Sequence, residues 1–161
     1  MKTKLLAALL VITITTAAGA AESDVSISAG GGLAYELLGL NLSARWGHVE
    51  PYAGIGMMSL FSGLAAGVRV FSREDGTGPF LAVNSAFHLD TLRIDERDAT
   101  GGRLFWTTVT GGYRIAAGHV FAQASIGGGV IASKTFWSTP PQRGTDWFVF
   151  PDGSLAIGVR L

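Results

Sequence analysis

The chain has 161 residues, enough for one domain, and its 12 basic and 12 acidic side chains leave no net charge at pH 7. It has no cysteine, which excludes a disulfide framework and a lipid-modified N-terminal cysteine. It also lacks the clustered basic residues that nucleic-acid binding requires, so no nucleic-acid partner is expected.

Residues 1–20 have the pattern of a secretory signal peptide. Lys2 and Lys4 give a positive start, residues 5–14 form an apolar stretch, and "AGA" at residues 18–20 is a small-residue cleavage site. The apolar stretch is too short for a membrane-spanning helix, although a retained anchor is the alternative. We therefore expect Sec-type export, removal of residues 1–20, and a mature domain of residues 21–161.

The mature chain alternates apolar and polar residues with period two, as strands with two different faces do. The alternation predicts eight strands, at residues 25–30, 38–46, 51–58, 64–71, 79–90, 103–115, 120–127 and 154–161. The joins at residues 47–50, 72–78 and 116–119 are short and turn-like. On the opposite side, residues 90–102 and 133–153 are expected to form long loops.

Eight strands of this length can close into an antiparallel up-and-down barrel. Strands of about ten residues, tilted near 45°, span the apolar core of a bilayer, and closure removes the unpaired edges that lipid disfavours. The predicted fold class is therefore all-β, an eight-stranded antiparallel up-and-down transmembrane β-barrel.

The composition of the polar face indicates which side points outward. A soluble periplasmic barrel, the alternative, would carry many Lys, Glu and Asp on its outer polar face. Here that face carries Gly, Ser, Asn, Gln and Thr, and nearly all acidic residues lie in the joins and loops. Trp46 and Tyr113 lie near strand ends, where interfacial aromatic residues are found. We expect the apolar face to meet lipid.

With these features the chain resembles small outer-membrane β-barrels of Gram-negative bacteria, the eight-stranded OmpA/OmpX-like class. The resemblance rests on the architecture, on the final strand, and on the Gly-rich segments "GGGLAY", "PYAGIG" and "ASIGGGV". Members usually end on an aromatic residue that the assembly machinery recognises, whereas this chain ends on Leu161. The resemblance implies an outer-membrane location, contact with lipid and lipopolysaccharide, recognition by the barrel-assembly machinery, and no cofactor.

Four arginines occupy similar positions near the ends of alternate strands. We expect them to face the lumen, because a charge facing lipid at mid-depth costs about 2–4 kcal/mol. The predicted lumen ion-pair layer comprises Arg45, Arg69, Arg114, Arg160 and Glu50. Glu22, Asp24, Glu74 and Asp75 are further candidate partners.

The layer has two interpretations, a charged constriction that makes a narrow pore and a plug of interior ion pairs. We favour the plug, because the bore of eight strands is just wide enough for side chains to fill. The other residues expected to line the lumen are Tyr52, Phe80, Phe121, Asn41, Asn84, Gln123, His88 and Asp90.

No catalytic or metal-ligating set is predicted. "HLD" places His88 and Asp90 on one face, but Ser85 lies on the opposite face of that strand, so a hydrolytic triad does not assemble simply. A lipid-modifying enzyme remains an alternative. "DERD" at residues 95–98 is more typical of a solvated charged loop than of a divalent-ion site.

The last predicted loop carries candidate interaction residues. Trp137, Trp147 and Phe148 are of the kind that anchor binding surfaces, and they could equally dip into the membrane interface. The expected function is therefore structural, or surface interaction of the extracellular loops with an extracellular protein or host ligand. The alternatives are a narrow pore, a lipid-modifying enzyme and a soluble barrel.

Overall fold

The computed structural model describes residues 24–35, 37–58, 61–94, 98–135 and 146–161. Side chains are described for these except at residues 33, 37, 58, 61–62, 88–94, 98–104, 132–135 and 146–147. The strands are β1 (Asp24–Gly32), β2 (Leu37–Arg45), β3 (Val49–Met58), β4 (Phe61–Phe71), β5 (Gly78–Ile94), β6 (Asp98–Ala117), β7 (Val120–Thr135) and β8 (Asp146–Arg160). One 3₁₀ turn, η1 (Leu33–Tyr35), follows β1.

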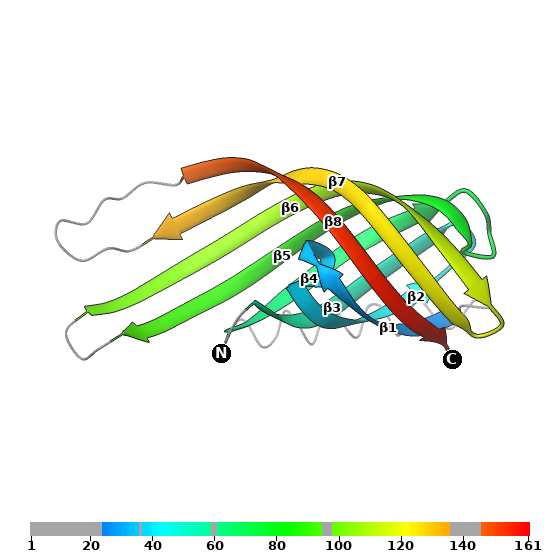
Figure 1. Ribbon diagram of the computed structural model, residues 1–161, viewed down its shortest axis with the longest axis horizontal. Helices are drawn as coiled ribbons and strands as arrows, with labels where there is room; N and C mark the ends of the chain where they lie inside the picture. The colour runs from blue at the N-terminus through cyan, green and yellow to red at the C-terminus, as the bar shows by residue number, and fades with distance from the viewer. Residues whose placement is uncertain (1–23, 36, 59–60, 95–97, 136–145) are drawn as a thin grey trace.

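Each strand pairs antiparallel with the next, and β8 pairs with β1, so the sheet closes into a barrel (Figure 1). The prediction of an all-β, eight-stranded antiparallel up-and-down barrel is confirmed. We call the end with the short turns and Leu161 the base, and the end beyond which β5–β8 continue the mouth. Figure 1 shows these four strands extending well past β1–β4.

The prediction of two long loops on the mouth side is wrong for most of their residues. β5 continues to Ile94 and β6 begins at Asp98, while β7 continues to Thr135 and β8 begins at Asp146. The segment "FPDGS" suggested a loop, but it lies inside β8. Pro151 is tolerated there because the β1 ladder ends beside Leu155, which makes this part of β8 an edge, the place where a sheet accepts proline.

The two faces of the barrel wall have opposite polarity. The outward side chains are aliphatic or aromatic and exposed, among them Leu40, Ile55, Met57, Leu64, Val83, Val109, Ile126 and Leu155. The inward side chains are buried and include all the buried charged groups; besides aromatic rings and alanines they comprise the polar residues Ser26, Ser28, Asn41, Glu50, Arg69, Asn84, Thr108, Arg114, Gln123 and Asp152. This is the reverse of a water-soluble protein, whose charged groups face solvent.

Three aromatic residues fill the lumen because glycines face them across the ladder. Tyr52 is paired with Gly67, Phe80 with Gly112, and Phe121 with Gly158. A Cβ at any of these glycines would clash with the ring opposite. The glycines thus make room for large side chains in a bore that eight strands leave narrow.

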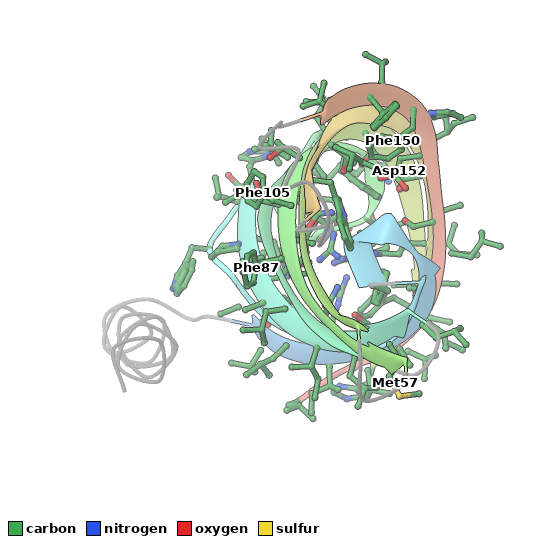
Figure 2. The ribbon with its side chains drawn as sticks, turned by 90° about the vertical axis from the view of Figure 1, so that its left-hand side faces the viewer. Met57, Phe87, Phe105, Phe150 and Asp152 are labelled. Atoms are coloured by element: carbon green, nitrogen blue, oxygen red, sulfur yellow. The ribbon has the colours of Figure 1, made fainter. Side chains whose placement is uncertain are left out.

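Gly32 turns the chain from the wall into the lumen. Its φ of 112° lies in a region that L side chains rarely adopt, and a Cβ there would clash with the Gly153 carbonyl oxygen. The next three residues form η1, which contacts β1–β5 and β8 and places Tyr35 among the lumen side chains. Figure 2, seen from the left-hand side of Figure 1, shows η1 inside the ring of strands.

Gly32→Ala is expected to destabilise the barrel, because backbone strain and the clash with β8 each contribute about 1–3 kcal/mol. Gly47→Ala is the matched control: Gly47 also has a positive φ, of 53°, but nothing lies within 4 Å of its missing Cβ. Its cost should be about 1 kcal/mol from strain alone. Urea unfolding of the refolded barrel measures both, and equal losses would show that close contact at Gly32 is unimportant.

Candidate functional site in the barrel lumen

Glu50 is the centre of a buried ion-pair cluster. Its Oε1 accepts hydrogen bonds from Arg69 Nη1 at 2.7 Å and from Arg114 Nη2 at 2.7 Å. Its Oε2 accepts a third bond from Arg114 Nη1 at 2.6 Å. The side chains of all three residues are at most 3% exposed. Glu50 and Arg69 come from the neighbouring strands β3 and β4, whereas Arg114 comes from β6. The cluster therefore connects strands that are not neighbours in the sheet.

Uncharged side chains extend the cluster across the lumen to β7, η1 and β1. Arg114 Nε and Nη2 donate to Gln123 Oε1 at 2.9 and 2.6 Å, and Gln123 Nε2 donates to the Tyr35 hydroxyl at 3.0 Å. Tyr35 in turn lies 3.1 Å from Ser28 Oγ. The resulting lumen network, Arg69–Glu50–Arg114–Gln123–Tyr35–Ser28, connects β4, β3, β6, β7, η1 and β1.

Aromatic rings enclose the two guanidinium groups. Arg69 Cζ lies 3.8 Å from the centroid of the Tyr52 ring, and Arg114 Cζ lies 4.5 Å and 4.3 Å from the centroids of Phe71 and Phe121. Arginine suits such a site because its flat group can stack on rings while its edge donates hydrogen bonds. Phe80 completes the packing, 5.2 Å from Phe71 between ring centroids.

The other two predicted arginines lie in a separate group at the base. Arg45 pairs with Asp24 and donates to the Gly47 carbonyl oxygen at 3.3 Å. Arg160 Nη2 donates to the Asp75 carbonyl oxygen at 2.8 Å and has no ion-pair partner among the described side chains. A Cβ at Gly76 would clash with Arg45, so the turn after β4 folds beneath the base.

The structure therefore divides the predicted layer in two. Strands in a closed barrel are tilted and staggered, so equivalent positions near strand ends do not stay at one height. Only Arg69 and Arg114 reach Glu50.

Six of the eight predicted lining residues have described side chains, and all six are buried. Asn41, Asn84 and Gln123 are buried, as are Tyr52, Phe80 and Phe121. Asn41 Nδ2 donates to the Ala34 carbonyl oxygen at 3.2 Å, which ties η1 to β2. The side chains of His88 and Asp90 lie outside the described residues.

Of the predicted loop residues, only Phe148 can be examined. It lies in β8 and is 58% exposed. Trp137 and the Trp147 side chain lie outside the described part of the chain.

Sequence reasoning missed several lumen residues. Tyr35 belongs to "GGGLAY", where the glycine run could have indicated a chain reversal. Trp106 lies in a predicted strand but was not named as a lining residue, and Asp152 lies in a segment predicted to be a loop. Both side chains are buried. Alternation extended past "PDG" would have placed Asp152 on the inner face.

The described residues show no assembled catalytic or metal centre. Ser85 Oγ is 3.0 Å from Thr107 Oγ1, and no three His, Asp or Glu side chains among those searched could hold a metal ion. Within the same residues, no helix is long and apolar enough to cross a membrane.

Comparison of the chain with protein-family models, with curated proteins and with solved structures finds no match.

Glu50→Gln is expected to destabilise the barrel by about 3–5 kcal/mol, because it leaves two buried guanidinium groups without a carboxylate. The matched control is Asp24→Asn, which breaks the ion pair of a half-exposed carboxylate and should cost about 1 kcal/mol or less. Urea unfolding monitored by tryptophan fluorescence measures both. Similar losses for the two variants would contradict a dominant role for Glu50.

Proposed function

We propose that the chain is an outer-membrane β-barrel with a filled lumen, which acts as a structural element and presents the hairpins of its mouth to the exterior. The observation that carries this proposal is the polarity of the wall, with apolar side chains exposed and ion pairs buried. In water, so continuous an apolar exterior would drive association. In a bilayer it is the favourable outer surface.

The strand lengths support the same proposal. β1–β4 have 9, 9, 10 and 11 residues. A tilted strand needs about 9–11 residues to cross the apolar core of a membrane. The longer β5–β8 would continue beyond the bilayer, which is where a surface-interaction role would lie. Residues 1–20 are predicted to be a signal peptide for export. The location we propose is therefore the outer membrane.

The lumen network favours a plug over a pore. Glu50, Arg69 and Arg114 form direct hydrogen bonds across the bore, and the rings of Tyr52 and Phe121 stack on the two arginines. A solute would have to break these bonds to pass. The partners we propose are lipid, lipopolysaccharide, the barrel-assembly machinery and an extracellular ligand that binds the mouth. We propose no catalytic role for the protein.

Val83→Arg tests whether the outer face meets lipid. Val83 points outward from β5 and is 53% exposed. If the face lies in lipid, arginine there should cost about 2–4 kcal/mol. If the face meets water, a surface change of this kind should stay within about 0.5 kcal/mol. The matched control is Val149→Arg, at an 86% exposed site on the extended part of β8.

The measurement is the free energy of unfolding of each variant in lipid vesicles. A small effect at both sites would contradict a membrane-spanning wall.

Single-channel recording in planar bilayers tests the plug. The wild-type barrel is expected to give no stable conductance steps, because the lumen network closes the bore. Stable steps that disappear in Arg69→Ala would support the narrow-pore alternative and overturn the plug. A large-pore barrel recorded under the same conditions controls for insertion.

A further inference from the structure

Asp152 is a buried acid that the lumen network does not use. Its side chain is inward on β8, the residue is 4% exposed, and neither carboxylate oxygen accepts a hydrogen bond from the part of the chain that the structure describes. Figure 2 shows it beside Phe150 near the mouth. Glu50, the other buried acid among the described side chains, has an arginine on each oxygen.

Among the described side chains, none offers Asp152 a compensating charge. Phe150, on the same face of β8, packs against the apolar cluster of Ala65, Ala86 and Trp106. Arg69 and Arg114 are engaged with Glu50. Arg160 lies on the same strand but eight residues nearer the base, about 27 Å away along an extended chain.

A lone buried carboxylate is costly. The penalty for taking an ion out of water is several kcal/mol in real proteins unless a counter-charge and hydrogen bonds offset it. A cation held at Asp152 would supply the missing counter-charge.

The β-ladder of the wall is incomplete beside Asp152. The β1 ladder ends at Leu155, so at Asp152 only β7 continues the ladder of β8, while Gly32 and η1 lie against its other side without ladder pairing. Local opening here breaks fewer backbone hydrogen bonds than elsewhere in the barrel.

We propose that Asp152 binds a monovalent cation, an alkali metal ion or ammonium, at the mouth of the lumen. One carboxylate balances one positive charge, and oxygen is the ligand that hard cations prefer. The cation does not continue to the base, because two arginines against one glutamate give the lumen network a surplus positive charge. The site is thus a dead end that is entered from the mouth.

The test uses the refolded full-length barrel in an uncharged detergent, at constant ionic strength. Chloride salts of Na⁺, K⁺ and NH₄⁺ are compared with the bulky cation N-methylglucamine. A cation that binds only the folded state raises the folded-to-unfolded ratio about 100-fold at 100 times its Kd. We expect a saturable increase of this kind for one or more of the small cations, and their order separates a metal ion from ammonium.

Asp152→Asn should abolish the response, and the matched control Asp24→Asn, at the base, should keep it. A wild-type barrel that responds to no small cation overturns the proposal, as does an equal response in Asp152→Asn. Stabilisation by acid without any cation effect also overturns it. If Asp152→Asn does not refold, ²³Na NMR of the wild type decides: saturable line broadening that K⁺ reverses supports the site, and its absence overturns it.

Discussion

Inside the narrow bore of eight strands, a carboxylate and two guanidinium groups must satisfy one another, because little water can do so. Glu50 meets this requirement with three hydrogen bonds from Arg69 and Arg114. The rest of the lumen follows from it. Gln123 accepts two further hydrogen bonds from Arg114 and donates one to Tyr35, and aromatic rings stack on both guanidinium groups. The order of the strands is thus reinforced by contacts across the barrel as well as around it.

The period-two pattern contained most of the architecture. It predicted the number of strands, the antiparallel closure and the inward direction of the arginines, because burying a charge or exposing it to lipid has a large energetic consequence. It could not assign partners. Which arginine reaches Glu50 depends on strand tilt and stagger, and no local sequence feature encodes these. The inward turn at Gly32 was likewise missed, since Tyr35 looks like any aromatic residue near a strand end.

The long strands on the mouth side were missed for a different reason. Gly, Pro and Asp favour turns, and "PDG" is a strong turn signal in isolation. At the edge formed by β8 beyond Leu155, however, proline need not complete a ladder on both sides. The same edge separates two chemical zones. Toward the base, the lumen is closed by paired charges. Toward the mouth, Asp152 lies among apolar groups without a counter-charge among the described side chains. In the function proposed here the base is a plug, and the mouth is the binding end.

The seam between β1 and β8 has a consequence for how the barrel forms. All other neighbouring strands are joined by a direct connection, so their contacts are local in sequence. The seam pairs Ser26 with Arg160 and ends after six residue pairs, whereas β5 and β6 share seventeen. Contacts between chain ends carry the largest loop-closure entropy and slow folding most. Closure therefore waits for the last strand. The β2–β3 ladder also has six pairs, but a turn joins those two strands, so the ring opens most easily along the seam.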